Sequence, residues 1–498
     1  MGKDNFVKNS FLLTSANITT GVLGFIFSIY LSNLIGPEGM GLYSLVMPVY
    51  NLFICLMTAG IIAAISQITA GYEAVGDYTN TNRTIKLVSS FNIIWSVIIG
   101  VLVFLFAPYI AETFIKDPRV LDAIKVTCPA MVFIALSNIL KGYFLGRSKI
   151  TVPASIDILE KAMRIITLAL LIAAFNASSI ELMVTLAYVS LAIGEFQSLL
   201  LLFIYYKCEK KKAPNSHHAR ESSTQLLFNV LIISLPLCIN GFLGNLFSML
   251  STLLVPFRLV AAGFERSVAL GMIGKFTGMA MTIVAFPMII ISSINQLLIP
   301  DLSYTLSKGN YYEATVRIRQ VIKIAFLIGL GTMIICNLIP NQLGEMFYGR
   351  SDLGSYIRFC SFCAPISFPS ITMYGILNGL NKQGIILRNS IICSIIEIIL
   401  LFILLPIPSI NILGYGIVMV ISSSIGFIIN LHEVRKHLDL QLNKTNIIIF
   451  ILIAALIFMI LKISIGLIFP AYSIIKNIII IAIVFGLIGY LTKFGLED

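Results

Sequence analysis

The stretch NIIIFILIAALIFMILKISIGLIF, residues 446–469, decides the class of fold. Lys462 is its one charged residue, and its apolar side chains do not alternate with polar ones as they do in a barrel strand. A helix that crosses a bilayer needs about 20 predominantly apolar residues. The stretch therefore predicts a transmembrane helix and excludes a transmembrane β-barrel.

The composition of all 498 residues agrees with this prediction. Hydrophobic residues make up 58% of the chain and charged residues 11%, with a mean hydropathy of +0.96. Soluble domains contain about 45–50% apolar and about 25% charged residues. The composition thus excludes soluble enzymes and disordered or collagen-like chains, and eight thinly spread cysteines do not indicate a disulfide scaffold. We expect an all-α polytopic membrane protein.

Long apolar stretches predict about fourteen transmembrane helices, which is what this length accommodates at roughly 35 residues per crossing and connection. The first stretch is expected to remain as a helix rather than to be removed as a signal peptide. The predicted spans are residues 6–35, 42–71, 87–109, 120–145, 154–175, 182–206, 225–257, 266–299, 314–340, 356–380, 385–406, 412–431, 447–469 and 474–493.

The lysines and arginines predict the orientation, because cytoplasmic loops of membrane proteins are enriched in them. About 21 of the 34 fall on the side of the N-terminus, about 7 in the opposite loops and about 6 within spans. Both termini are therefore expected in the cytoplasm, for a protein of the cytoplasmic (inner) membrane. The net charge of +11 is explained by this topology and by contact with anionic lipids, so no nucleic-acid partner is expected.

The chain also repeats itself at an offset of 237 residues. Ile-Leu-Lys-Gly at 139–142 precedes Glu160, and Ile-Leu-Asn-Gly at 376–379 precedes Glu397. The repeat predicts two six-helix lobes in a pseudo-two-fold relation, an arrangement typical of transporters. The expected domains are an N-terminal lobe at 1–206, a basic cytoplasmic linker at 207–224, a C-terminal lobe at 225–431, and a loop with two further helices at 432–498.

Charged residues inside spans are the candidate site, because a charge at bilayer depth costs at least about 2.5–3.5 kcal/mol and must face protein or water. Glu160 and Arg164 lie four residues apart on one face of the fifth span. Two interpretations are equally compatible with this spacing. The pair can hold helices together, or it can line a cavity in which Arg164 meets an anion.

Three further positions carry weaker signals. Lys275 has no acidic neighbour three or four residues away, which favours a cavity-facing ammonium over a side chain that reaches the membrane surface. Arg258 ends the seventh span and suits either a structural anchor or a head-group contact. Glu195 and Glu397 are single carboxylates that are either protonated and buried or form a coupling-ion or proton site.

Glycines and a proline in the first, second, seventh and eighth spans predict bends that gate a central cavity. Close packing of helices through small residues is the other explanation. The candidate gating residues are Gly21, Gly24, Pro48, Gly241, Gly244, Gly274 and Gly278.

The sequence shows no catalytic centre. The four histidines, His217, His218, His432 and His437, lie in predicted cytoplasmic loops beside lysines and arginines. The pair at 217–218 has no cysteine or carboxylate partner at ligand spacing. No phosphate loop is present either. We therefore expect no enzyme, no cofactor, no metal and no ATP-driven pump.

Three strings resemble a known family: IGPEGMGLYSLVMP at 35–48, KGYFLGRSKITVPA at 141–154 with EKAMR at 160–164, and LLVPFRLVAAGF at 253–264 with GKFTGMAM at 274–281. They are similar to the stage V sporulation protein B family, which belongs with the polysaccharide-biosynthesis transporters and lipid II flippases of the multidrug/oligosaccharidyl-lipid/polysaccharide superfamily.

The resemblance implies twelve core helices in two V-shaped lobes and two helices that form a lipid-side groove. It implies a flippase that moves an undecaprenyl-diphosphate-linked saccharide to the outer leaflet for spore cortex peptidoglycan, with cell-wall synthesis machinery as a partner. Arg258 matches the family's Val-Pro-x-Arg-Leu string, and Glu160 and Arg164 match its Glu-x-x-x-Arg. Lys275 lies where relatives have a polar residue.

One departure shifts weight among these residues. Related flippases carry arginines on the first helix, whereas residues 9–35 of the first span here contain no lysine or arginine. The sequence leaves two alternatives to a flippase, namely a cation-coupled multidrug exporter of the same superfamily and a non-transporting scaffold of sporulation. For transport we expect alternating access, driven by an ion or voltage gradient or by consumption of the product.

Overall fold

A computed structural model describes residues 3–58, 60–212, 221–441, 443–468 and 474–493, and all their regular structure is helical. The first half of the chain contains α1 (Lys3–Thr58), α2 (Ile61–Ala74), α3 (Tyr78–Tyr109), a π-helix η1 (Ile110–Ile115), a 3₁₀ turn η2 (Pro118–Val120), α4 (Leu121–Gly146), α5 (Thr151–Phe175), α6 (Ile180–Lys212) and α7 (Ser223–Ala261). The second half contains α8 (Arg266–Ile273), a π-helix η3 (Gly274–Ala280), α9 (Met281–Ala285), α10 (Met288–Ser307), α11 (Tyr311–Leu338), α12 (Pro340–Tyr348), a 3₁₀ turn η4 (Ser351–Leu353), α13 (Gly354–Ser361), α14 (Ala364–Gly379), α15 (Gln383–Leu404), α16 (Leu413–Arg435), α17 (Lys444–Ile468) and α18 (Ile474–Lys493).

Ten helices of the described residues are long and apolar enough to cross a membrane. The number is eleven if Ser351–Ser361 and Ala364–Gly379, which meet at a bend of 54°, form one broken span. The prediction of an all-helical multi-pass membrane protein is confirmed.

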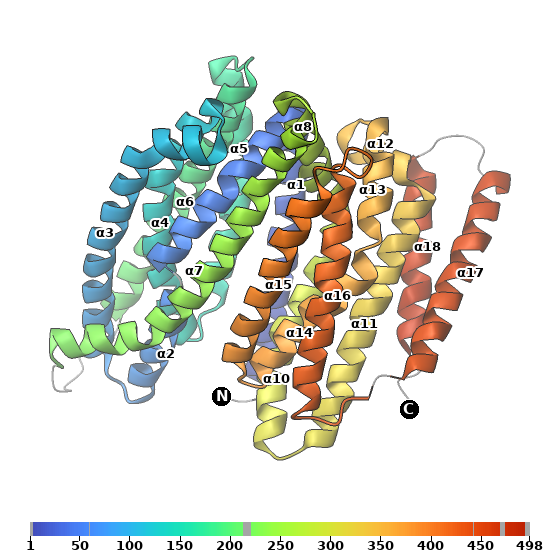
Figure 1. Cartoon of the computed structure of the whole chain (residues 1–498). Helices are drawn as coiled ribbons and strands as arrows, with labels where there is room; N and C mark the ends of the chain where they lie inside the picture. Colours follow the sequence, from blue (N-terminus) through green and yellow to red (C-terminus); the bar gives the residue numbers. More distant parts are fainter. Residues whose placement is uncertain (1–2, 59, 213–220, 442, 469–473, 494–498) are drawn as a thin grey trace. The chain divides into compact units, whose positions relative to one another are not determined.

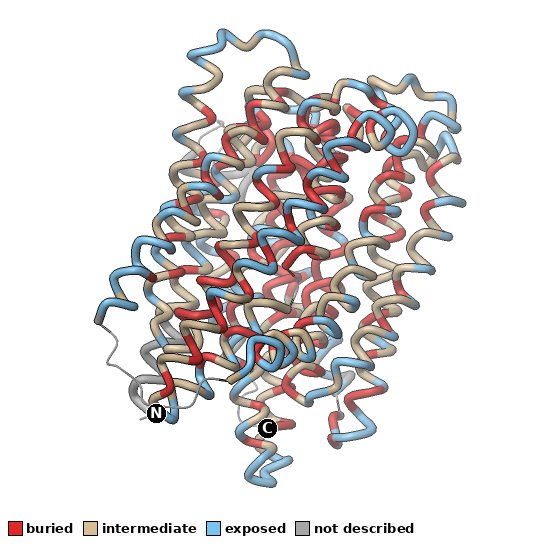
Figure 2. Tube along the Cα trace, turned by 90° about the vertical axis from the view of Figure 1, so that its left-hand side faces the viewer, coloured by how far each residue is buried: buried red, intermediate tan, exposed pale blue. Residues whose placement is uncertain are grey.

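Large apolar side chains lie exposed along the helices, as a protein surface in contact with lipid requires. On α3 they include Ile94, Val101 and Leu105, and on α17 they include Leu452 and Ile463. Figure 2 shows exposed residues along the lengths of helices as well as at their ends.

Two compact units divide the chain. Unit 1 comprises Met1–Ile35 and Leu42–Leu253, and unit 2 comprises Gly36–Gly41 and Leu254–Asp498. The boundaries predicted at 206, 224 and 431 remain a prediction from the repeat, and residues 213–220 of the predicted linker lie outside the described residues.

In unit 1, α4 packs against α2, α3 and α6 (Figure 1). Two glycines of α4 let the backbone of α2 approach closely. A Cβ atom on Gly142 would lie 2.9 Å from the carbonyl oxygen of Ile62, and one on Gly146 would lie 2.6 Å from that of Ser66. These positions exclude any larger residue without a shift of the backbone.

In unit 2, α14 takes the corresponding place against α10, α11 and α16 (Figure 1). A Cβ atom on Gly379 would lie 3.3 Å from the carbonyl oxygen of Ile299 and 3.0 Å from Cβ of Leu302. Gly142 meets Ile62 and Ile65 in the same way. All three positions of this contact therefore recur at the offset of 237 residues found in the sequence.

The string at 35–48 breaks the long first helix at Gly36, whose φ of 66° is left-handed. Residues 36–41 belong to unit 2 and pack against α8 and η3. A Cβ atom on Gly41 would lie 2.2 Å from the carbonyl oxygen of Leu270, and one on Gly274 would lie 1.8 Å from that of Pro37. Two of the recognised strings thus meet backbone to backbone.

The structure shows where the helices with predicted bends are continuous and where they are interrupted. Helix α1 continues through Gly21, Gly24 and Pro48, because neighbouring helices can compensate for a proline in a membrane span, and its break is at Gly36. Helix α7 is continuous through Gly241 and Gly244, and Figure 1 shows a bend between its first part and the rest of the helix. In the eighth span, Gly274 and Gly278 lie in the π-helix η3, and their gating role stays a prediction.

Candidate functional site

Helix α5 carries the main candidate site. Asp157, Glu160, Lys161 and Arg164 recur at spacings of three and four residues, so they share one side of the helix. Glu160 is 4% exposed and Arg164 is 8% exposed. Glu160 and Arg164 are therefore buried within unit 1, whereas the side chains of Asp157 and Lys161 are 37% and 34% exposed.

Arg164 is held by aromatic residues of α1. Its Nη2 donates a hydrogen bond to the hydroxyl of Tyr43 at 2.8 Å, and its guanidinium lies 4.2 Å from the ring centre of Phe27. Its buried Nε has no hydrogen-bond partner among the described residues. A buried donor without a partner costs about 1–3 kcal/mol, which indicates room for an acceptor from outside the chain.

Helices α4, α5 and α6 together bring six charges into one cluster. Lys161 pairs with Glu160 at 2.8 Å, and Lys141 of α4 pairs with Asp157 at 2.7 Å. Glu195 of α6 is 6% exposed and interacts electrostatically with Glu160, Lys141 and Arg164. We call these residues the charged cluster: Lys141, Asp157, Glu160, Lys161, Arg164 and Glu195.

The charged cluster has three positive and three negative side chains, so it is neutral when all six are ionised. Glycine at position 194 of α6 makes space for it, because a Cβ atom there would lie 3.2 Å from Oε1 of Glu160. That oxygen, like Nε of Arg164, is buried and has no hydrogen-bond partner among the described residues. The cluster therefore contains one donor and one acceptor that form no hydrogen bond with the described residues.

Three tyrosines complete the cluster and were missed by the sequence analysis. The ring of Tyr43 stacks on Tyr188 with 4.9 Å between centres, and the hydroxyl of Tyr188 donates to the carbonyl oxygen of Tyr43 at 2.8 Å. Tyr50 interacts electrostatically with Glu195, Arg164 and Glu160. Phenol groups inside spans need a polar partner, and this requirement is the signal that could have identified them.

Lys275 does not present the unpaired ammonium that the local sequence predicts. Its Nζ lies 2.7 Å from a carboxylate oxygen of Asp352, which also pairs with Arg350 at 2.8 Å. The hydrogen bonds that Arg350 donates to Asp352 raise the pKa of the Arg350 guanidinium above its ordinary value. The head-group role of Lys275 remains a prediction, and any substrate anion there competes with Asp352.

The other candidates of unit 2 lie near α15. Nε of Arg258 donates to the carbonyl oxygen of Phe402 at 3.1 Å, and the guanidinium stacks 3.8 Å from the ring centre of Phe402. Arg258 thus caps one of the last carbonyls of α15, as an anchoring residue does. Glu397 is half-buried and interacts electrostatically with Tyr415 and Cys393.

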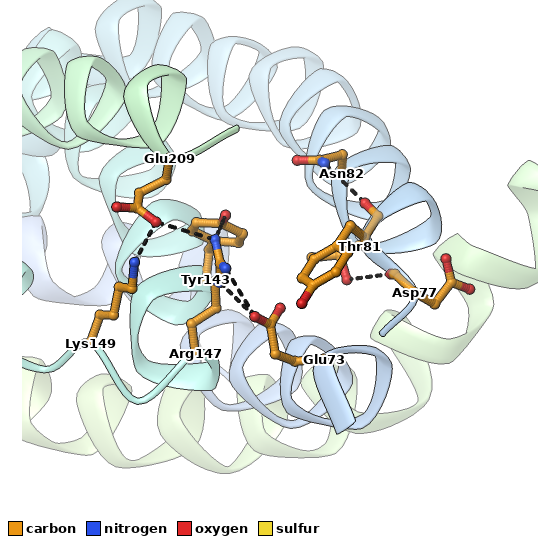
Figure 3. A network of polar contacts seen from close by, with 9 residues as sticks. Glu73, Asp77, Thr81, Asn82, Tyr143, Arg147, Lys149 and Glu209 are labelled. Carbon is orange, nitrogen blue, oxygen red and sulfur yellow. Dashed lines mark hydrogen bonds and ion pairs between the residues drawn. The ribbon is translucent and has the colours of Figure 1, made fainter. Parts of the chain in front are cut away.

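The string at 141–154 forms a polar network at the end of α4 (Figure 3). Arg147 pairs with Glu73 of α2 at 2.9 Å, donates to the hydroxyl of Tyr143 at 2.7 Å, and reaches Glu209 of α6 at 3.5 Å. Lys149 also pairs with Glu209. Burial lowers the pKa of Arg147, but Tyr143 and Glu73 outweigh it and raise the pKa above its ordinary value. The network joins the ends of three helices.

The predicted gating glycines fall into two kinds. Cβ atoms on Gly24 and Gly244 would have no described heavy atom within 4 Å. One on Gly278 would lie 2.9 Å from Cε of Met40, and Gly274 is tighter still. Close packing therefore explains Gly274 and Gly278, whereas it does not explain Gly24 and Gly244.

Among the described residues, no group of three or more histidine, cysteine, aspartate or glutamate side chains is placed to hold a metal ion. His217 and His218 lie outside the described residues.

Comparison with known proteins agrees with the resemblance noted in the sequence. Residues 6–306 match the family described as polysaccharide biosynthesis protein, and residues 236–403 match the MatE family. Stage V sporulation protein B of Bacillus subtilis (strain 168) is 28% identical over 444 residues, which cover 89% of this chain and 86% of that protein. Lipid II flippase MurJ of the same organism is 24% identical over 418 residues, which cover 79% and 76%.

A solved structure of the lipid II flippase MurJ, in an inward closed conformation, has the same fold. The TM-score is 0.74 at 14% sequence identity, and the match covers 98% of this chain and 100% of that one. The resemblance to the sporulation protein B family and to its superfamily is confirmed, and the fold is MurJ-like.

Proposed function

The chain belongs to the polysaccharide biosynthesis protein family, and we propose that it is a flippase for a polyprenyl-diphosphate-linked saccharide. It is a membrane transporter and not an enzyme. The relatives named stage V sporulation protein B and lipid II flippase support a lipid II-like substrate and a place in sporulation. The use of the product for spore cortex peptidoglycan and its transfer to cell-wall synthesis machinery are part of the proposal.

A flippase must lower the barrier for a charged head group. A sugar diphosphate carries about two negative charges and cannot cross hydrocarbon unaided, whereas its polyprenyl tail can stay in lipid. The observation that carries the proposal is the buried guanidinium of Arg164, whose Nε has no hydrogen-bond partner among the described residues. A phosphate oxygen is the acceptor that this donor suits best.

The neutral charged cluster suggests how binding is coupled to a proton. An incoming anion meets a balanced set of charges, so binding is favoured when one carboxylate is protonated and the cluster becomes positive. Glu195 faces Glu160 as a like charge within the cluster, so Glu195 is the proposed acceptor of that proton. Release of the proton then favours release of the head group.

We propose fourteen crossings, three more than the eleven counted from length and composition. The first counted element, Leu12–Ala74, has 63 residues, which is enough for two crossings, one before and one after Gly36. Helix α5 has 25 residues but carries the four charges of the candidate site. Helix α18 adds a short apolar segment, Lys476–Leu491. Both termini are then cytoplasmic, in the inner membrane, with basic loops against anionic lipids.

The transport cycle proposed here is alternating access, with two six-helix lobes in a pseudo-two-fold relation. The flexible points are Gly36 and the π-helix η3, because π-turns inside helices often mark sites that move. Gly24 and Gly244 have space beside them and keep a gating role. Lys275 and Arg258 remain head-group candidates that leave Asp352 and Phe402 when substrate arrives.

A cation-coupled multidrug exporter is the alternative that a specific observation favours. Residues 236–403, which include Glu397, match the MatE family. Such an exporter would depend on Glu397 and on drug efflux, and not on Arg164. A non-transporting scaffold would tolerate the loss of either residue.

The test measures how much lipid-linked precursor reaches the outer leaflet in cells that lack other flippases. Arg164→Gln is expected to reduce it at least tenfold, since one charged hydrogen bond to phosphate is worth about 1.5–3 kcal/mol. Lys462→Gln is the matched control, because it removes an exposed cation from the span α17. Membrane insertion is checked by protease accessibility.

Unchanged flipping in both Arg164→Gln and Lys275→Ala would reject the cation-based mechanism. Drug resistance that disappears in Glu397→Gln, with normal precursor flipping, would establish the exporter instead. Normal sporulation with every intramembrane charge neutralised would favour the scaffold.

A further inference from the structure

A cavity of about 630 Å³ lies within unit 2, between α11, α14, α16 and α17. Its volume falls in the range of about 300–1,000 Å³ that is usual for small-molecule sites. The charged cluster of unit 1 contributes no residue to it. The lining residues used here are Arg319, Gln320, Lys323, Phe326, Asn446 and Phe450.

Two cations face this cavity from successive turns of α11. Arg319 and Lys323 are four residues apart, and none of the described lining residues is acidic. Nε of Arg319 is buried and has no hydrogen-bond partner among the described residues. Nζ of Lys323 lies 5.2 Å from the ring centre of Phe450, on the opposite wall. The cavity therefore has positive charge in excess and a donor without an acceptor.

The lining is amphipathic along α11. Arg319, Gln320 and Lys323 lie nearer the start of the helix, and Phe326 lies one turn further on. The connection from α16 to α17 is at the same end of unit 2 as the start of α11 (Figure 1), and it contributes Gln441 to the lining. A ligand with an anionic head and an apolar chain matches this order of polar and apolar walls.

The corresponding place in unit 1 is built differently. The repeat offset of 237 residues relates Arg319 to Asn82, which accepts a hydrogen bond from the hydroxyl of Tyr206. Its neighbour Arg83 donates to the carbonyl oxygen of Glu221 at 2.7 Å. The same offset relates Lys323 to Lys86, which is exposed, so unit 1 keeps one of the two cations. The pair of Arg319 and Lys323 beside a covering helix is a feature of unit 2.

We propose that this cavity binds the phosphate head group of an anionic diacyl phospholipid of the bilayer. Arg319 and Lys323 hold the phosphodiester, the amides of Gln320 and Asn446 offer hydrogen bonds, and Phe326 and Phe450 contact the start of the acyl chains. Basic pockets between membrane helices are known to take such head groups. The bound lipid fastens α17 to α11, and this site does not depend on the proposed flippase function.

The experiment reads lipid binding from fluorescence in bilayer vesicles of phosphatidylcholine. Trp95 is the one tryptophan of the chain, so Trp95→Phe with Phe450→Trp places a single reporter in the cavity wall. Brominated phosphatidylglycerol is expected to quench the reporter with an affinity about tenfold or more above that of brominated phosphatidylcholine. Native mass spectrometry of the unaltered chain, with phosphatidylglycerol added, checks that the reporter itself does not create the site.

Arg319→Gln with Lys323→Gln is expected to reduce the preference for phosphatidylglycerol to about onefold. Lys210→Gln with Lys211→Gln, which removes two exposed lysines of α6, is the matched control and is expected to keep it. An unchanged preference in the first variant, or an equal loss in the control, would overturn the proposal. So would displacement by millimolar inorganic phosphate, which indicates a small-anion site, or far tighter binding of undecaprenyl phosphate, which would assign the cavity to the transported lipid.

Discussion

Helices α5 and α15 occupy corresponding positions in the repeat but differ in charge. Both carry a glutamate at the shared position, Glu160 in α5 and Glu397 in α15. Four residues further on, α5 has the buried Arg164, whereas α15 has the fully buried Leu401. The glycine contacts at Gly142 and Gly379 recur in both units. The position four residues after the shared glutamate nevertheless carries a charge in unit 1 and an apolar side chain in unit 2.

The difference shows what a buried charge in a span requires. Arg164 remains buried because Tyr43, Phe27 and the carboxylates of the charged cluster surround it. Leu401 needs no such partners, because apolar packing satisfies it. A charged surface that needs three helices to stabilise it is costly to keep for structure alone, and this cost favours a role in binding.

Leu401→Arg is the most severe test of the comparison. It copies the charge of unit 1 into unit 2 without the partners, so we expect a loss of about 3 kcal/mol or more in stability. Thermal unfolding in detergent, followed by size-exclusion chromatography, measures it. Leu401→Met is the control of similar volume and should stay near the parent chain. An arginine variant as stable as the parent would show that unit 2 also contains a hidden set of polar partners.

Gly274→Ala sharpens the distinction between packing and gating glycines. An added Cβ atom would lie 1.8 Å from the carbonyl oxygen of Pro37, so we expect a loss of about 2 kcal/mol or more. Gly24→Ala has no such neighbour and should be neutral or slightly stabilising, because alanine favours a helix. The same unfolding measurement compares the two. Equal shifts would contradict the contact between the two recognised strings.

Arg147→Gln and Arg388→Gln compare the ion pairs at the helix ends of the two units. The side chain of Arg147 is 12% exposed and joins two glutamates, so its loss is expected to destabilise by about 1.5 kcal/mol. Arg388 pairs with Glu433 at 2.5 Å but is 55% exposed, so its loss should cost less than about 1 kcal/mol. Addition of salt should change the difference in stability loss between the two variants only slightly. A larger effect at Arg388 would reverse the comparison.

The crossing helices could be predicted from the sequence because hydropathy over about 20 residues is a local property. The fifth span is an instructive case. Because of its charges, α5 is not among the ten helices counted as membrane spans from length and composition. The spacing of these charges nevertheless predicted that Glu160 and Arg164 share one side of the helix, and both are buried in the structure.

Tertiary contacts decided what local patterns could not. Lys275 has no acidic neighbour within a turn, so its partner Asp352 could not be inferred from α8 and η3 alone. Tyr43 and Tyr188 meet across elements far apart in the chain. The break at Gly36 falls between the predicted spans 6–35 and 42–71, but only the structure shows that residues 36–41 pack against α8 and η3.

By itself, the order of residues determined that this chain crosses a bilayer many times, and it determined which positions repeat at an interval of 237. The free energy of removing apolar side chains from water depends on each segment alone, which is why no partner is needed to predict it. The fold decided which charges pair with each other. It also decided which donors, such as Nε of Arg164 and of Arg319, have no hydrogen-bond partner among the described residues. Electrostatic pairing acts over a few ångströms in space, and only the packed helices bring distant residues within that range.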